Sequence, residues 1–393
     1  METLITYSNR KISQLRHSFE RYLMEDIDWE QRLIVLLGHR GSGKTTLMLQ
    51  RMKQSQQKAI YLTLDHLYFE SNRLITTIES LYDQGYRHFY VDEVHKYLHW
   101  SIDLKNAYDA FNDVQIVATG SSILEISKGK ADLSRRSVVY HLYGLSFREF
   151  LNLTLSKNFP PIELPQLINE HSEIAEELII QVNLKADFNS YLKSGYYPFF
   201  NDGSKSYSQK LMEVSNLIIE VDIMAYEDIN HSTVRNLKKL LFLISQSVPY
   251  KPNVSKLAEA LHVSRNTILK MLDILHRAQV LHLLKTDAHG NSFLQKPEKV
   301  YLQNTNLSYL FTDKPNAGNI RETFFLNQVS VKHEVLSSRY ADFLVNNKHT
   351  FEVGGPNKNA AQISGVGEAY LAVDGIEIGQ SNKIPLWMFG FLY

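Results

Sequence analysis

One short stretch near the N-terminus, LIVLLGHRGSGKTTLMLQ, constrains the fold of this chain more than any other. Its apolar first residues predict a buried strand, and the residues after the lysine predict a helix. Between them, Gly38, Gly41, Gly43, Lys44 and Thr45 fit the pattern G-x-x-x-x-G-K-[ST]. Because glycines lack a Cβ, such a loop brings backbone N–H groups close to phosphate oxygens at the start of a helix. The stretch therefore predicts a strand, a phosphate-binding loop and a helix in succession.

Each part of this loop has an expected role. Lys44 is expected to reach the β and γ phosphates of a nucleotide, and Thr45 is expected to be a ligand of Mg²⁺. The residues expected to contact bound ATP are Gly38, His39, Arg40, Gly41, Ser42, Gly43, Lys44, Thr45 and Thr46. The alternative is a glycine-rich turn that precedes a helix by chance, and the complete pattern with its flanking segments favours phosphate binding.

A second strand that ends in acids is needed for hydrolysis, and RHFYVDEVHKY supplies one. After the apolar run 89–91, Asp92 is expected to join the Mg²⁺ shell and Glu93 to polarise the attacking water. The alternative is a strand followed by a solvated acidic turn. Together with the loop, this pair predicts a Mg²⁺-dependent ATPase.

Two further segments contribute candidate catalytic residues. The expected strand 114–118 ends in small hydroxyl residues, of which Ser121 is a candidate for orienting the attacking water; the alternative is a turn that uses its hydroxyls on its own backbone. Arg135 and Arg136 precede another apolar strand, where an arginine can face the γ phosphate of a neighbouring subunit in a homo-oligomer. An ordinary surface pair is the alternative.

The apolar runs alternate with helical segments, which predicts an α/β domain with a parallel sheet covered on both faces. The expected strands span residues 33–37, 59–64, 88–91, 114–118 and 138–142. The strand that bears the hydroxyls follows the strand that bears the acids, as in P-loop ATPases that insert a strand between their two nucleotide motifs. Before the loop, helical spacing predicts an amphipathic helix through Ile12, Leu15, Phe19, Tyr22 and Leu23.

Composition narrows the function further. The chain has 42 basic and 42 acidic residues, a net charge of +0, so any nucleic-acid surface has to be a local patch. It has 0 cysteines, which excludes disulfides, thiolate metal sites and a cysteine nucleophile. The N-terminus has no apolar signal region, and no apolar run approaches the roughly twenty residues of a membrane span. We expect a cytoplasmic protein without a membrane partner.

The middle of the chain is expected to be helical up to about residue 248, and a helix-turn-helix follows. Its helices are predicted at 254–261 and 265–277, with VLHLLKTD as the first strand of a wing. Ser264, Arg265 and Asn266 begin the second helix, where contact with DNA is expected. A winged helix that packs against protein is the alternative.

The last segment holds a third group of polar residues. Glu322 on a helix and Asp342 and Glu352 on two strands resemble the Mg²⁺ ligands of some nucleases. The lysine expected two residues after Glu352 is replaced by Gly354, and Lys358 lies beyond a turn whose course the sequence does not give. We expect a degenerate site that does not cut DNA appreciably; if Lys358 folds back, the site regains its cation.

With these motifs, the chain resembles the AAA-type ATPases (AAA_14) that carry a C-terminal DUF4143 domain, in the single-chain form common in Bacteroidetes. The resemblance rests on GHRGSGKTTL, YVDEVH, VATGSS, DLSRRSVVYHLYGLSFREFL, GNIRETFFLNQ, FEVGG and IPLWMFGFLY. It implies ATP hydrolysis, an arginine pair at positions 135 and 136, a winged helix and an endonuclease-like α/β domain.

We therefore expect an ATPase domain at 1–150, a helical lid or connector at 151–248, a winged helix at 249–296 and a DUF4143-like domain at 297–393. Three outputs stay open: an ATPase acting on DNA, a signal-transducing nucleotide switch that contacts a protein, and an ATP-regulated nuclease.

Overall fold

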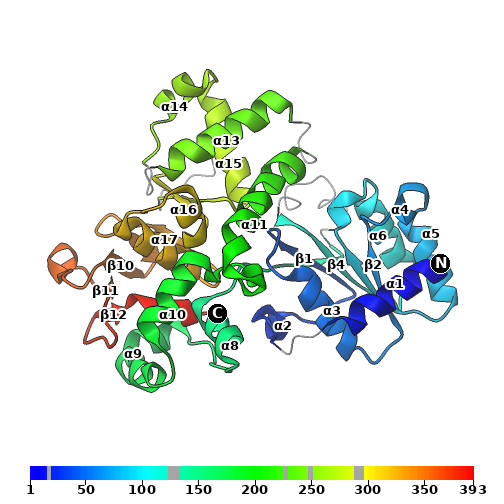
Figure 1. The fold of residues 1–393 in the computed structure, drawn as a ribbon, viewed down its shortest axis with the longest axis horizontal. Helices are drawn as coiled ribbons and strands as arrows, with labels where there is room; N and C mark the ends of the chain where they lie inside the picture. Colours follow the sequence, from blue (N-terminus) through cyan, green and yellow to red (C-terminus); the bar gives the residue numbers. More distant parts are fainter. Residues whose placement is uncertain (16–18, 123–132, 134, 225–228, 247–250, 287–295) are drawn as a thin grey trace. The chain divides into compact units, whose positions relative to one another are not determined.

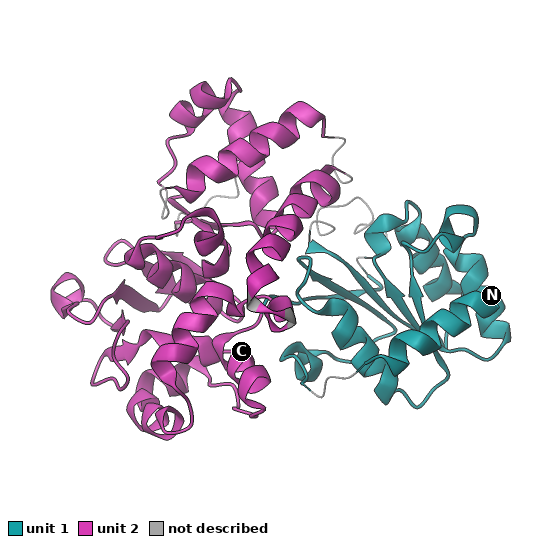
Figure 2. Cartoon of the chain, viewed as in Figure 1, with its two compact units in different colours: residues 1–144 teal, residues 145–393 magenta. Residues whose placement is uncertain are grey.

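The computed structural model describes the 393-residue chain except residues 16–18, 123–132, 134, 225–228, 247–250 and 287–295. The chain forms two compact units, Met1–Gly144 and Leu145–Tyr393 (Figure 2). Among the helices of the described residues, none combines the length and the apolar character that crossing a membrane requires.

The first unit contains a five-stranded sheet with the order β2-β3-β4-β1-β5, in which every neighbouring pair is parallel (Figure 1). The strands are β1 (Leu33–Gly38), β2 (Ala59–Thr63), β3 (His88–Asp92), β4 (Gln115–Ser121) and β5 (Val138–His141). Since β4 lies between β1 and β3, the predicted inserted strand is confirmed.

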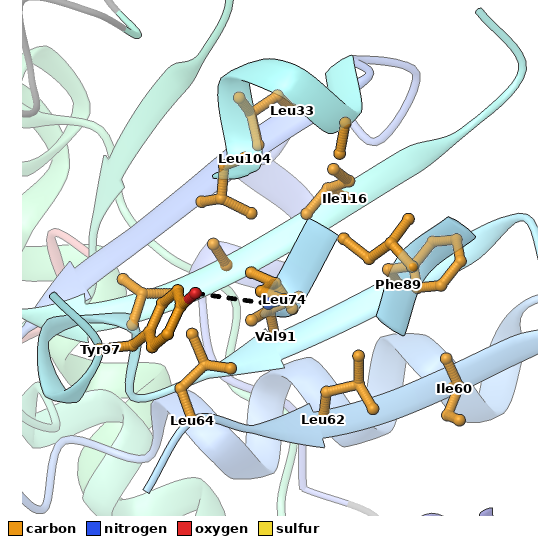
Figure 3. Close-up of a cluster of buried hydrophobic side chains, with 14 of the residues drawn as sticks. Leu33, Ile60, Leu62, Leu64, Leu74, Phe89, Val91, Tyr97, Leu104 and Ile116 are labelled. Carbon is orange, nitrogen blue, oxygen red and sulfur yellow. Dashed lines mark hydrogen bonds between the residues drawn. The ribbon is translucent and has the colours of Figure 1, made fainter. Parts of the chain in front are cut away.

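Helices cover both faces of this sheet, as strands buried on both sides require. They are α1 (Glu2–Ser13), α2 (Leu23–Asp26), α3 (Lys44–Gln54), α4 (Tyr68–Ser71), α5 (Leu74–Asp83), the short 3₁₀ helix η1 (Val94–Lys96) and α6 (Trp100–Ala110). On one face, α5 and α6 pack on alternate strand residues such as Leu33, Phe89 and Ile116 (Figure 3). On the other face, α3 packs on the intervening residues, which include Ile34 and Tyr90.

Two expectations for this unit were wrong in detail. The helix predicted through residues 12–23 ends at Ser13, and residues 19–22 are not helical. The reason is that the Arg21 side chain donates hydrogen bonds to backbone carbonyls far along the chain. Strand β4 continues to Ser121 instead of ending at 118, because residues 119–121 extend the parallel pairing with β1. The hydroxyls at Thr119 and Ser121 therefore lie within a strand and not in a turn.

The second unit begins with helices, as predicted. They are α8 (Phe147–Leu155), α9 (Leu164–Ile179), α10 (Leu184–Ser190), η3 (Tyr191–Gly195), η4 (Pro198–Asp202), α11 (Ser204–Leu217), η5 (Ile218–Asp222) and α13 (His231–Ser245). Tyr196 and Tyr197, which follow η3, are 1% and 2% exposed and belong to the core of this unit.

Next come α14 (Val254–Leu261) and α15 (Arg265–Arg277), whose bounds agree with the predicted helices. His262 ends α14 in the left-handed conformation, and the Ser264 side chain accepts a hydrogen bond from the Thr267 N–H at the start of α15. Strands β6 (Leu281–Leu284) and β7 (Lys299–Leu302) then pair antiparallel. The tip between these strands lies outside the described residues.

The C-terminal part adds a mixed sheet with the order β12-β11-β10-β9-β8. Its elements are α16 (Thr305–Phe311), α17 (Ala317–Val329), β8 (Val335–Ser337), β9 (Phe343–Val345), β10 (His349–Gly354), η6 (Ala360–Ile363), β11 (Ala369–Val373), β12 (Lys383–Pro385) and η7 (Leu386–Phe391). The apolar residues of η7 are buried, so this segment is part of the core of the second unit.

Candidate nucleotide-binding site

The glycine-rich loop runs from the end of β1 to the start of α3. Gly41 and Gly43 have φ angles of 78° and 97°, a left-handed conformation that favours glycine. Lys44 is the first residue of α3, and its Nζ donates hydrogen bonds to the carbonyl oxygens of Gly38 at 2.8 Å and His39 at 3.0 Å. The lysine side chain thus lies over the same loop in which bound phosphates are expected.

Strand β5 limits which residue can occupy position 38. A Cβ added to Gly38 would meet the backbone carbonyl of Leu142, whose N–H donates to the Leu37 carbonyl at 2.7 Å. The loop therefore needs a glycine here to fit against the chain that leaves β5.

Asp92 is the centre of a buried hydrogen-bond cluster on the face of the sheet covered by α3. Its Oδ2 accepts from Thr45 Oγ1 and from the Tyr61 hydroxyl, both at 2.8 Å, and its Oδ1 accepts from Thr119 Oγ1. Burial, followed by the Asp92 charge, raises the pKa of Tyr61, so this hydroxyl stays protonated and donates. The structure thus brings together Thr45 and Asp92, the two predicted Mg²⁺ ligands.

Glu93 follows Asp92 in a strained backbone conformation. Its φ is 56°, which is uncommon for a residue with a Cβ and recurs at functional sites. Its N–H donates to Thr119 Oγ1 at 3.2 Å, and its Oε2 lies 3.2 Å from Nε2 of His95. Its side chain is 23% exposed, so the carboxylate is accessible from solvent.

Arg21 is a site residue that sequence reasoning missed. Its guanidinium is buried and donates to the Ser42 carbonyl in the loop and to the carbonyls of Tyr143 and Gly144 at 2.9 and 2.8 Å. The side chain thus links the loop to the last residues of the first unit. The only sequence signal was a charged residue inside an apolar pattern, which by itself does not distinguish a surface position from a buried one.

The remaining candidates lie in different surroundings. Ser121 is buried and pairs with Gly38 across β4 and β1, whereas Thr119 is the hydroxyl that contacts Asp92 and Glu93. Arg136 forms a two-point ion pair with Asp109, with its Nε 2.8 Å from Oδ1 and its Nη2 3.0 Å from Oδ2. Arg135 is exposed. Of the two arginines, Arg135 is therefore the more exposed.

The residues present fit a Mg²⁺–nucleotide complex. Ser42 Oγ is buried and has no hydrogen-bond partner among the described residues, so a phosphate oxygen would satisfy it. Thr45 and Asp92 would hold Mg²⁺, which neutralises phosphate charge when bound. Lys44 is buried at the same loop and supplies a positive charge. The site thus contains a phosphate cradle, a pair of metal ligands and an adjacent carboxylate.

A second group of polar residues lies in the C-terminal part. Lys299 Nζ is 3.1 Å from both Glu322 Oε2 and Asp342 Oδ1. Lys358 folds back so that its Nζ contacts Glu352 Oε1, and its side chain covers Gly354, where an added Cβ would lie 2.6 Å from its Cγ. The lysine missing from position 354 is thus replaced by one from beyond the turn.

Burial shifts the pKa values of this group. It raises the pKa values of Glu322 and Glu352, and the charge of the nearby Asp342 raises both further. Burial alone would lower the pKa of Lys299, but Glu322 and Asp342 outweigh it and raise the pKa. In the described part of the chain, no three acidic or histidine side chains converge on one metal position.

Two parts of the chain match models of protein families, and one of these parts lies almost entirely in the first unit. Residues 30–151 match a family model described as an AAA domain, and residues 185–315 match a domain of unknown function, DUF8612. The first match spans the parallel sheet and the loop, so the N-terminal part is similar to AAA-type P-loop ATPase domains, a class that generally binds ATP with Mg²⁺.

Individual proteins are more distant. The chain is 26% identical over 304 residues to the uncharacterized protein MJ1637 of Methanocaldococcus jannaschii; the match covers 73% of this chain but only 63% of the relative. An uncharacterized protein of Haemophilus influenzae is 24% identical over 318 residues, with 75% and 74% covered. The Walker-type ATPase PABY2304 of Pyrococcus abyssi is similar over 75% of this chain and 95% of that one, with 14% identity and a TM-score of 0.43.

Proposed function

We propose that this protein binds and hydrolyses ATP in a Mg²⁺-dependent reaction and couples its nucleotide state to DNA binding or remodelling through a winged helix at 249–296. The observation that carries the ATPase part is the placement of Thr45 Oγ1 2.8 Å from Asp92 Oδ2, with Glu93 next in the chain. Lys44 binds the transferred phosphate, and Glu93 accepts a proton from the attacking water.

The DNA part of the proposal is supported by the surface of α14 and α15. Arg265, Asn266 and Lys270 are exposed at the start of α15, while Ile268 and Leu272 on its other side are buried. A helix with basic and amide side chains at its exposed N-terminal end has the groups that contact phosphates and base edges. The alternative is a signal-transducing switch in which this surface contacts a protein.

The test is the ATP hydrolysis rate of the purified full chain with Mg²⁺, measured with and without double-stranded DNA. We expect hydrolysis by the wild type, its loss in Lys44→Ala, and stimulation by DNA. The matched control is Lys53→Ala, on the same helix. Hydrolysis that persists in Lys44→Ala contradicts the assigned site, and hydrolysis that DNA leaves unchanged favours the protein-contacting switch.

A second candidate function is metal-dependent DNA cleavage by an endonuclease-like, DUF4143-type domain at 297–393. It is favoured by the contact of Lys358 with Glu352, because such sites need a cation beside the carboxylates. A buried network of ion pairs with a structural role is the alternative, and we retain the expectation that the protein does not cut DNA appreciably.

Nicking of supercoiled plasmid in Mg²⁺ or Mn²⁺ decides between them. Cleavage by the wild type that is lost in Asp342→Ala and Lys358→Ala, but retained in the exposed control Lys348→Ala, would establish the nuclease. No nicking by the wild type would leave the ion-pair network as the account of this cluster.

A further inference from the structure

His95 lies beside the proposed catalytic carboxylate. Residues Val94–Lys96 form the single 3₁₀ turn η1, in which the Lys96 N–H donates to the Glu93 carbonyl at 2.9 Å. This turn places Nε2 of His95 3.2 Å from Oε2 of Glu93, and only 7% of the histidine side chain is exposed. The two atoms are close enough for an ion pair when the imidazole is protonated, but the N–H is not aligned for a hydrogen bond in this structure. Contacts between catalytic groups often become aligned only once substrate is bound.

The backbone of Glu93 is fixed independently of this contact. Thr119 Oγ1 accepts the Glu93 N–H at 3.2 Å and donates to Asp92, which ties the acidic pair to the neighbouring strand β4. The left-handed φ of 56° at Glu93 persists only where surrounding contacts hold it. Thr119 therefore fixes where the Glu93 side chain begins, and His95 contacts the end of that side chain.

We propose that His95 is a positioning residue for ATP hydrolysis, because its imidazole holds the Glu93 carboxylate in the orientation that receives a proton from the attacking water. The proposal rests on the function proposed above. A glutamate side chain has several rotatable bonds, and a general base is effective only within hydrogen-bonding reach of the proton it abstracts. A carboxylate has about four lone-pair sites, so one N–H donor leaves capacity to accept from water.

Substitutions at position 95 separate positioning from packing. The amide nitrogen of His95→Gln occupies about the place of Nε2 and keeps a donor, whereas His95→Phe keeps a ring and removes the donor. We expect His95→Ala and His95→Phe to lower kcat about tenfold or more with an unchanged KM for ATP, because binding does not involve this residue. We expect His95→Gln to recover part of kcat and the exposed neighbour Lys96→Ala to match the wild type.

The measurements are steady-state ATP hydrolysis and the melting temperature of each full-length variant. A wild-type kcat in His95→Phe would overturn the positioning role. Equal loss of kcat in all His95 variants, Gln included, with a parallel fall in melting temperature would show that His95 only supports the fold. A wild type that does not hydrolyse ATP would overturn the proposed function and this inference together, whereas an active wild type with an equally active His95→Ala would overturn only the inference.

Discussion

At the scale of single residues, His39 in the phosphate-binding loop makes the stability of the folded protein depend on pH. The residue is 1% exposed, its Nδ1 lies 2.8 Å from the Arg40 carbonyl, and burial lowers its pKa to about 3, with Lys44 and Arg21 adding to the effect. In the unfolded chain, the same imidazole titrates near its ordinary value of 6.5. The folded protein therefore keeps His39 neutral where the unfolded chain takes up a proton.

This difference predicts how stability depends on pH. Above pH 6.5, His39 is neutral in both states and the free energy of unfolding is not reduced by its titration. As pH falls from 6.5 towards 3, only the unfolded chain gains the proton, so the free energy of unfolding falls. The slope is about 1.4 kcal/mol per pH unit within that window. Urea denaturation between pH 7.5 and 5 should show a larger loss of unfolding free energy in the wild type than in His39→Gln. Equal losses in both proteins would contradict a buried, neutral His39.

Some residues of the site could be predicted from the sequence and others could not. Asp92 and Glu93 stood out because a phosphate-binding loop that hydrolyses nucleotide needs a second strand ending in acids, and RHFYVDEVHKY supplies one. Tyr61 and Thr119 lie on the same face of the sheet as Asp92, which follows from the alternation of strand residues. The sequence did not single out Tyr61, since a tyrosine in a buried strand is ordinarily a core residue. Thr119 was expected only as one of the small hydroxyl residues that end its strand, with Ser121 as the candidate. His95 was missed because its approach to Glu93 depends on the turn η1.

At the scale of elements, α15 is the part of the second unit on which the DNA proposal depends. Its first residues are exposed, and the Ser264 side chain caps its N-terminus. The N-terminal end of a helix attracts anions, so this end of α15 is suited to contact a DNA phosphate. If the surface binds DNA, the charged and amide side chains there contribute directly.

We predict that Arg265→Ala with Asn266→Ala weakens binding to double-stranded DNA at least about thirtyfold, since each good contact to a base or phosphate contributes about 1–3 kcal/mol and the double variant loses two. Fluorescence anisotropy at several salt concentrations measures this, with Lys185→Ala on the exposed side of α10 as control. Affinity that is unchanged in the double variant would exclude α15 as the DNA-contacting element and favour a protein partner.

Element prediction succeeded where periodicity and flanking signals agreed. The bounds of α14 and α15 follow from apolar spacing with a short polar turn between the helices. The helix expected at 12–23 was wrong because the side chain of Arg21 forms long-range hydrogen bonds, which local spacing does not encode. The contact between Lys358 and Glu352 was unpredictable for a similar reason, since it depends on the path of the turn between them.

At the scale of the whole molecule, we predict a homo-oligomer in which an arginine acts on the ATP of a neighbouring subunit. The ion pair with Asp109 occupies Arg136, and Arg135 is exposed, so Arg135 is the better candidate. Inactive Arg135→Ala chains mixed with inactive Lys44→Ala chains should regain part of the hydrolysis rate, because some interfaces then join an intact arginine to an intact loop. A rate per chain that stays constant on dilution to a proven monomer would refute this arrangement.

In the proposed reaction, Glu93 acts on water after Lys44 and its loop have bound the phosphates. The most direct measurement is the nucleotide retained by purified Glu93→Gln after incubation with ATP and Mg²⁺, identified by chromatography beside its turnover rate. We expect this variant to retain ATP with turnover reduced at least a hundredfold, whereas Lys44→Ala retains none. Full turnover by Glu93→Gln, with ADP as its retained nucleotide, would show that Glu93 is not the residue that acts on water.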